Sequence, residues 1–344
     1  MDISNLIDLI PGLPSDLGLE CLTRLPHAAH RVALQVCSQW HRLLQSEDFY
    51  KHRKKFGHTR KVTCLLQARQ EQPLQGKPAS LPSPYGISIF DPDTMTWDWV
   101  LPVPDYPFGL PMFSQLASCD GNLVLMGGWD PTTYQPLSAL FVYDFRTSLW
   151  RRGKDMLDKR SFFALGSGLG RVYVAGGHDE NKNALSSAWA YDPSSDEWAG
   201  LAQMARERDE CEGVVIGDEF WVVSGYGTER QGLFDGSAEV LDIGSGKWRE
   251  VNGCWEEGGC PRSCVGVGKD GKLVNFRGLD PRLKAGLCGV LVGSRVLLSG
   301  SDYDGAPHGF YLVDMEEGQH RKLRRISVPH CFSGFVQSGC CVEI

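Results

Sequence analysis

The residues best suited to chemistry in this chain are its histidines and cysteines, and their spacing matches no catalytic or metal site. Downstream of residue 61 the histidines are His178, His308, His320 and His330, and none stand in the HxH or HxxxH spacing that brings imidazoles onto one metal ion. The 12 cysteines include no CxxC pair, and the sequence holds no GxSxG, HExxH or Walker motif. We therefore predict a protein with no cofactor, metal ion or active site of its own, whose chemistry is binding.

A second group of residues has the composition of a protein-binding surface. Aromatic, histidine and acidic side chains recur just after an inner glycine, in WDPTTYQPLS, HDENKNALSS, YGTERQGLFDG and SDYDGAPH. Aromatic residues and arginine are enriched at the energetic centres of interfaces. We predict that the residues around a partner-binding site are Trp129, Asp130, His178, Asp179, Tyr226, Arg230 and Tyr303. The alternative is that Trp129 and Tyr226 only cover the neighbouring repeat.

These segments occupy equivalent positions in a repeat. In its clearest copy, Gly170 to Trp198, a β-rich run ends in a glycine pair, and a second run ends in Tyr-Asp before a tryptophan. Glycine permits close backbone approach, aspartate starts a tight turn, and tryptophan fills a wedge between units. Spacings of 53, 48 and 50 residues separate the turn aspartates, which are Asp91, Asp144, Asp192 and Asp242. The pattern predicts four-stranded sheets arranged as propeller blades.

This repeat resembles the kelch repeat, whose double glycine, Tyr-Asp and spaced tryptophan match Gly176-Gly177, Tyr191-Asp192 and Trp198. The resemblance implies an all-β kelch propeller over residues 58–344. The length favours six blades, and five are possible because Ser263 to Phe276 can form two strands but lacks the glycine pair and the tryptophan. We expect the last C-terminal strand to close blade one from the inside, which removes exposed sheet edges.

The first 60 residues lack β alternation and are predicted to form three short helices. Their apolar residues recur at the i, i+3, i+4 spacing of amphipathic helices. Ser15 is a candidate N-cap, Pro26 ends the first helix, and Ser46 or Asp48 could cap the third. So small a core needs a partner surface. The basic run from Lys51 to Lys61 is predicted to be the solvated end of a helix, and the alternative is a nuclear-localisation or nucleic-acid segment.

Residues 10–57 resemble the F-box, and residues 1–9 are then an N-terminal tail. In that family the opening Leu-Pro and the apolar residues that follow dock on a Skp-type adaptor, which links to a cullin-RING ubiquitin ligase. The adaptor-binding residues implied by the resemblance are Leu13, Pro14, Leu17, Leu22, Leu25, Pro26, Val36, Cys37, Trp40 and Leu44. The alternative is that they form the core of a helical cap on the propeller, and for Val36 and Trp40 both interpretations are open.

Charge and hydropathy exclude other classes of protein. Residues 1–61 carry 9 Lys/Arg against 6 Asp/Glu, a net charge of +3, which leaves −10 for the rest of a chain whose total is −7. A propeller so acidic is a poor ligand for nucleic acid. No apolar run approaches the 18 residues of a membrane-spanning helix. With no secretory leader, we expect reduced thiols and a cytoplasmic or nuclear protein, with no nucleic-acid or membrane partner.

The resemblance extends to both ends of the chain. The opening DLIPGLPSDLGLECLTRLPH and the ending FSGFVQSGCCVEI are similar to those of plant F-box/kelch-repeat proteins that direct the turnover of phenylalanine ammonia-lyase, or of type-B response regulators in cytokinin signalling. It implies a non-catalytic substrate receptor of an SCF-type ubiquitin ligase, with a role in phenylpropanoid metabolism or hormone control. The alternative is a kelch scaffold that binds partners without a ligase and whose helical cap is structural.

Overall fold

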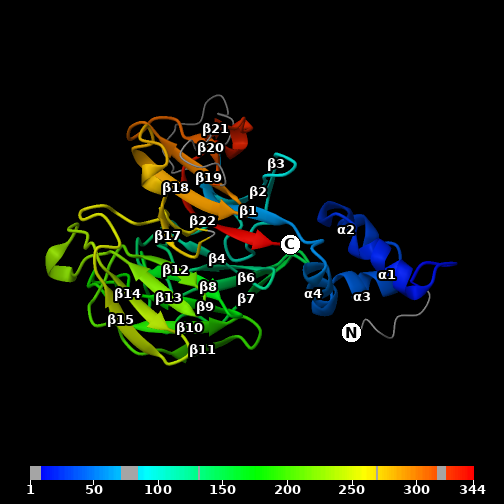
Figure 1. Ribbon diagram of the computed structural model, residues 1–344, viewed down its shortest axis with the longest axis horizontal. Coiled ribbons are helices and arrows are strands. Elements are labelled where there is room, and N and C mark those ends of the chain that lie inside the picture. The colour runs from blue at the N-terminus through cyan, green and yellow to red at the C-terminus, as the bar shows by residue number, and fades with distance from the viewer. Residues whose placement is uncertain (1–8, 71–83, 131, 269, 316–322) are drawn as a thin grey trace.

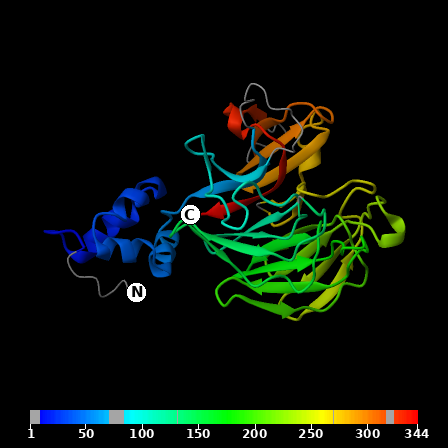
Figure 2. The same ribbon diagram turned by 180° about the vertical axis from the view of Figure 1, so that it is seen from behind.

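The computed structural model describes residues 9–70, 84–130, 132–268, 270–315 and 323–344. A small helical bundle is followed by a β-propeller, and the two parts lie side by side (Figures 1 and 2). Almost all of the predicted N-terminal tail, and His320, lie outside the described residues.

Three blades are each built from four consecutive antiparallel strands. Blade 2 contains β4 (Gln115–Cys119), β5 (Asn122–Met126), β6 (Leu140–Asp144) and β7 (Leu149–Arg152). Blade 3 contains β8 (Ala164–Gly168), β9 (Arg171–Ala175), β10 (Ala188–Asp192) and β11 (Glu197–Gly200). Blade 4 contains β12 (Glu212–Ile216), β13 (Glu219–Val223), β14 (Ala238–Asp242) and β15 (Lys247–Val251).

Blade 1 joins the two ends of the propeller. Its strand order is β22-β1-β2-β3, so the C-terminal strand is innermost, as the sequence predicted. The register pairs Cys64 with Cys340 and Val62 with Val342. The strands are β1 (Lys61–Ala68), β2 (Tyr85–Asp91), β3 (Thr96–Trp99) and β22 (Val336–Glu343).

Among the described residues, the sector between blade 4 and the last blade holds two strands, β16 (Val265–Val267) and β17 (Leu273–Asn275). The last blade again has four strands, β18 (Ala285–Val292), β19 (Arg295–Ser301), β20 (Gly309–Asp314) and β21 (Leu323–Arg325). Each innermost strand contacts the next around the ring, in the order β22, β4, β8, β12, β16, β18 and back to β22. The described residues thus form five complete blades and a two-stranded sheet that fills the remaining sector.

The repeated residues have the roles predicted for them. The indole N–H groups of Trp150, Trp198 and Trp248 each donate to a backbone carbonyl of the preceding interblade connection, at 2.7–2.8 Å. The carboxylate of Asp192 accepts the backbone N–H of Ser194 at 2.9 Å and so forms the turn before the outer strand. The three tryptophan bonds tie blades 2, 3 and 4 to the connections that precede them.

The glycine pairs end the second strand of a blade in a conformation that suits glycine alone. Gly177 has φ +82°, and a Cβ there would lie 2.4 Å from the carbonyl oxygen of Ser161. Any larger residue would push the end of this strand away from the segment around Ser161, which leads into the inner strand.

The N-terminal segment forms four helices rather than the three predicted. An additional break lies at residues 34–37, where the Sγ of Cys37 accepts the backbone N–H of Trp40 and caps a new helix. Ser15 is the first helical residue rather than the cap, and Ser46 caps the last helix through the N–H of Phe49. The helices are α1 (Ser15–Thr23), α2 (His27–Ala33), α3 (Ser38–Leu44) and α4 (Glu47–Lys55).

The bundle docks on the propeller through α2 and α4. The Tyr50 hydroxyl donates to the backbone carbonyl of Glu343 at 3.0 Å, and its ring covers Gly121, where a Cβ would approach within 2.9 Å. His27 contacts the backbone oxygen of Phe145 at 3.3 Å. Gly121 and Phe145 lie in the β4–β5 and β6–β7 turns, so the helices cover the end of the propeller that carries these turns, here called the helix face (Figure 1).

Candidate protein-binding sites

The predicted partner-binding segments lie at the end of the propeller opposite the helix face. Neighbouring strands of a blade are antiparallel, so successive connections lie at opposite ends of the propeller. The turns that contact the helices join strands one to two and three to four, and the connection between the second and third strands therefore lies at the other end. This end, here called the loop face, carries residues 127–130, 132–139, 176–187, 224–237 and 302–308. The short η2 helix (Thr228–Arg230) marks it at the side of the molecule farthest from the helices (Figure 1). A partner bound there is kept apart from one bound to the helices.

Two of the predicted site residues shape their own loops. The carboxylate of Asp130 accepts the backbone N–H groups of Thr132 and Thr133, both at 2.8 Å. Asp179 accepts the N–H of Asn181 at 2.8 Å and that of Asn183 at 2.9 Å. These bonds hold the pKa of both carboxyls below the usual value, in Asp179 against the opposing effect of burial. Both aspartates therefore fix the backbone conformation of their own loops on the loop face.

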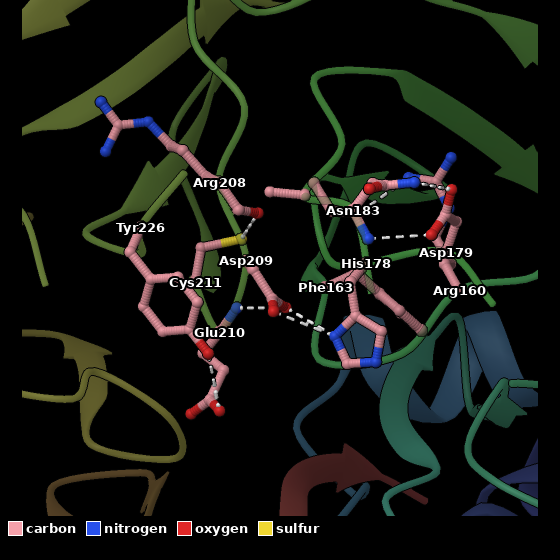
Figure 3. A network of polar contacts seen from close by, with 12 residues as sticks. Arg160, Phe163, His178, Asp179, Asn183, Arg208, Asp209, Glu210, Cys211 and Tyr226 are labelled. Atoms are coloured by element: carbon pink, nitrogen blue, oxygen red, sulfur yellow. Dashed lines mark hydrogen bonds and ion pairs between the residues drawn. The ribbon is translucent and has the colours of Figure 1, made fainter. Parts of the chain in front are cut away.

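His178 is buried and is hydrogen-bonded to Asp209 across the blade 3–blade 4 junction (Figure 3). Its Nδ1 lies 2.9 and 3.0 Å from the two carboxylate oxygens, and Asp209 also accepts the N–H of Glu210 at 2.8 Å. This pair connects blade 3 to the segment that leads into blade 4. Because both side chains are buried, it offers no surface to a partner.

Trp129 belongs to an aromatic cluster at the centre of the loop face. Its ring centroid lies 5.3 Å from that of Phe113, 5.7 Å from Phe162 and 6.1 Å from His178. The guanidinium of Arg262 lies 4.4 Å from the Phe162 ring centroid, a cation–π contact. Phe113, Phe162 and Arg262 come from three interblade connections, so the cluster joins parts of the chain that are distant in sequence.

The remaining predicted residues differ in exposure. Tyr226 is buried and donates its hydroxyl to Glu210 at 3.0 Å, so it supports the loop face from beneath. Arg230 is exposed on η2, and Tyr303 is 67% exposed. Of the seven predicted residues, Tyr303 and Arg230 are therefore free to contact a partner, and Trp129, Asp130 and Asp179 are partly exposed.

The connections that enter the inner strands contain residues that the sequence analysis overlooked. Four non-glycine residues with left-handed backbone, φ +49° to +58°, each stand two positions before an inner strand: Phe113, Phe162, Glu210 and Ser263. Such a conformation costs about 1 kcal/mol or more per residue and gathers at functional sites. Sequence reasoning missed these residues because it considered only the segments after the glycine pairs. The signal that could have found them is their constant position, two residues before each inner strand.

A channel of about 220 Å³ runs between the inner strands, and the carboxyl of Glu212 lines it. Glu212 accepts backbone N–H bonds from Gly213 at 3.2 Å and from Ser263. Desolvation raises the pKa of Glu212 to about 7, although these two amides and Arg262 act in the opposite direction. The channel therefore holds a carboxyl group that is half ionised near neutral pH.

Replacing Glu212 by glutamine is expected to stabilise the propeller at pH 8 by about 1–2 kcal/mol, a value reduced because Glu212 lines the channel and is partly exposed. The folded state binds the Glu212 proton more tightly than the unfolded state, so the wild type loses stability as pH rises from 4.5 through 7. Glutamine keeps an acceptor for Ser263 without the charge. Denaturant midpoints should favour the variant at pH 8 and converge near pH 4.5. A constant difference at every pH would show that Glu212 titrates normally.

The helical bundle divides the predicted adaptor-binding residues into exposed and buried groups. Leu22 and Leu44 lie in its core, and the Trp40 indole is tied to the Leu9 carbonyl at 2.7 Å. They support the bundle and offer little surface in this arrangement. Leu25 is half-buried. The exposed residues of the set are Leu13, Pro14, Leu17, Pro26, Val36 and Cys37.

Comparison with known proteins assigns both parts of the chain. Residues 10–52 match the F-box domain family, and residues 114–157 and 159–205 match the kelch motif. F-box/kelch-repeat protein At1g15670 of Arabidopsis thaliana is 36% identical, across 98% of this chain and 100% of its own length. The chain belongs to the plant F-box/kelch-repeat family.

Other relatives agree with this assignment of the F-box/kelch-repeat protein. Two Arabidopsis thaliana proteins, F-box/kelch-repeat protein At1g80440 and F-box/kelch-repeat protein SKIP20, are 41% and 37% identical. The alignments cover 70% and 72% of this chain, and 69% and 67% of the relatives. A solved structure titled "Structure of YjhT" shares the fold with a TM-score of 0.55, at 14% identity over 70% of this chain and 91% of that one.

As a member of this family, the F-box/kelch-repeat protein is a non-catalytic subunit. In the part of the chain that the structure describes, no group of three or more His, Cys, Asp or Glu residues could hold a metal ion. No helix among the described residues is long and apolar enough to cross a membrane.

Proposed function

We propose that this protein is the substrate-recognition subunit of an SCF-type cullin-RING ubiquitin ligase. The observation that carries the proposal is the opposite placement of the two candidate surfaces. α2 and α4 dock on the helix face, while α1 and the α2–α3 turn keep Leu17 and Val36 exposed on the bundle. The loop face lies at the other end of the propeller, so an adaptor and a target can bind together.

The mechanism is proximity. The bundle holds a Skp-type adaptor and through it the cullin-RING assembly, and the loop face holds a folded or partly folded protein. Attack of a target lysine on the ubiquitin thioester becomes effectively intramolecular, and this chain contributes no reacting group. Its 12 free cysteines suit the cytosol or the nucleus, where thiols stay reduced.

For the targets, we propose phenylalanine ammonia-lyase or a type-B response regulator, which would place the receptor in phenylpropanoid metabolism or cytokinin signalling. The support is the sequence resemblance over both ends of the chain. Reconstitution with a Skp-type adaptor, cullin, RING protein and conjugating enzyme tests both parts. Ubiquitin chains on one target support the proposal. Failure of the full chain to co-purify with any Skp-type adaptor would overturn it and favour a kelch scaffold.

The double variant Trp129→Ala, Tyr303→Ala is expected to abolish target capture, with at least a tenfold weaker Kd. Tyr303 supplies exposed aromatic area, and Trp129 organises the cluster around Phe113 and Phe162. Pull-down of target and of adaptor from the same preparation measures the effect. Adaptor binding should be unchanged. Loss of both would indicate misfolding, in which case Tyr303→Ala alone, which removes no buried contact, decides the question.

A further inference from the structure

The centre of the loop face is a pit that leads into the channel. Its wall contains Phe113, Phe162, Arg262 and Gln337, and Glu212 lies where the pit meets the channel. Both phenylalanines are held in left-handed backbone and face this opening from neighbouring interblade connections. The pit is therefore built by the blade-entry positions rather than by the loops after the glycine pairs.

The charges around the pit do not balance. Glu210 lies 3.4 Å from the Nε of Arg262 and accepts the hydroxyl of Tyr226. Glu212, by contrast, has hydrogen bonds only from backbone N–H groups and no ion pair among the described residues. The Arg262 guanidinium thus pairs with Glu210 and not with Glu212, and a carboxyl buried without a counter-ion favours its protonated form.

The walls of the pit suit a cation. The Arg262 guanidinium already lies 4.4 Å from the Phe162 centroid, and the Phe113 ring stands 4.8 Å from that of Phe162. Aromatic faces attract Lys and Arg side chains, most strongly where water is excluded. Residues 62–344 also carry a net charge of −10, which attracts a basic segment at long range.

We propose that the pit receives a lysine or arginine side chain of the bound protein, whose cation lies against Phe113 and pairs with the carboxylate of Glu212. This rests on the proposed function, in which the loop face binds a protein target. The incoming cation supplies the missing counter-charge. If the Glu212 carboxyl had no part in recognition, the pit would bind another kind of side chain. An acidic side chain would bind beside Arg262, or an apolar side chain would fill the aromatic opening.

The test uses the full chain and four pools of degenerate eleven-residue peptides, each with Arg, Lys, Glu or Leu fixed at the centre. The Arg and Lys pools should be retained at least tenfold better than the Glu and Leu pools. Glu212→Gln should reduce this retention about tenfold. The matched variant Glu197→Gln, at an exposed position on β11, should retain the pools as the wild type does.

The same binding has a defined pH dependence. Retention of the Arg pool should rise about tenfold between pH 6 and pH 8 as Glu212 ionises, and the rise should disappear in Glu212→Gln. The other charged or titratable groups around this carboxyl are Arg262, Glu210, Cys264 and Cys288, with Cys340 and Cys341 on the same channel. Burial raises the pKa of all four thiols above this range.

Preference for the Glu or Leu pool, or equal retention by wild type and Glu212→Gln, would overturn the proposal. Adaptor co-purification is measured on the same protein. Selective retention of basic peptides without adaptor binding would support the pit and reject the ligase function. Adaptor binding without selective retention of basic peptides would support the ligase function and reject the proposed role of the pit.

Discussion

Replacing Arg208 by methionine is expected to lower the free energy of unfolding by about 3–5 kcal/mol. Arg208 is one of the largest fully buried side chains of the propeller, and its Nε lies 3.3 Å from Glu239, which is equally buried. The guanidinium also donates to the backbone carbonyl of Ser224 at 2.9 Å and to the Ser237 hydroxyl at 2.8 Å. The variant leaves the buried Glu239 without its counter-ion, held only by the backbone N–H groups of Ala205 and Arg206, and removes the donor of the other two acceptors.

The matched control is Arg206→Met, two residues away. Arg206 forms two ion pairs, with Asp235 at 3.3 Å and Glu250 at 3.0 Å, but its side chain is 55% exposed. Ion pairs in water contribute little, so this change should cost less than about 1 kcal/mol. A count of ion pairs would predict the larger loss of stability for the Arg206 variant, whereas burial predicts the larger loss for the Arg208 variant.

Urea and thermal denaturation of both variants, followed by circular dichroism, measure this difference. Arg208→Lys provides an intermediate case if the methionine variant does not accumulate, because lysine keeps the charge but cannot reach all acceptors. Equal losses in the Arg206 and Arg208 variants would show that the buried network carries no special stability.

The sequence was sufficient to predict the blades because each repeat contains its own framework signals. The tryptophans that tie neighbouring blades, the turn aspartates and the glycine pairs are local in sequence and recur in register. Closure by the C-terminal strand followed from length, since blade 1 lacked an inner strand. The two potential strands between Ser263 and Phe276 are β16 and β17, and the missing glycine pair and tryptophan correspond to the incomplete sheet.

The site could be predicted only in part because its residues are brought together by the ring. Trp129 and Tyr303 were predicted from local loop composition, and the structure places both on the loop face. His178 was assigned to the surface, whereas it is buried, because its partner Asp209 lies in the next blade. Arg208 gave no local signal, since its partners Ser224 to Glu239 come later in the chain. The additional helix break at Cys37 depends on a weak sulfur cap that propensity rules do not detect.

Substituting aspartate for both Leu17 and Val36 is expected to weaken binding of a Skp-type adaptor at least 100-fold. The two side chains are 50% and 59% exposed, so the unbound chain loses little when they change. Burial of a leucine or valine contributes about 1.5–3 kcal/mol, and a carboxylate placed in the same interface must be desolvated as well. Two such changes exceed the roughly 2.8 kcal/mol that corresponds to 100-fold.

The control is Leu149→Asp with Leu169→Asp, which replaces two propeller leucines exposed by 65% and 61%. Both variants add two negative charges at similarly exposed positions, so general effects on solubility and net charge are matched. Binding kinetics of each to the immobilised adaptor, beside circular dichroism, separate the surfaces. If the adaptor contacts α1 and the α2–α3 turn, only the bundle variant loses binding. If both variants bind as the wild type does, the adaptor uses another surface, and if both lose binding, net charge rather than the exposed apolar contact controls the complex.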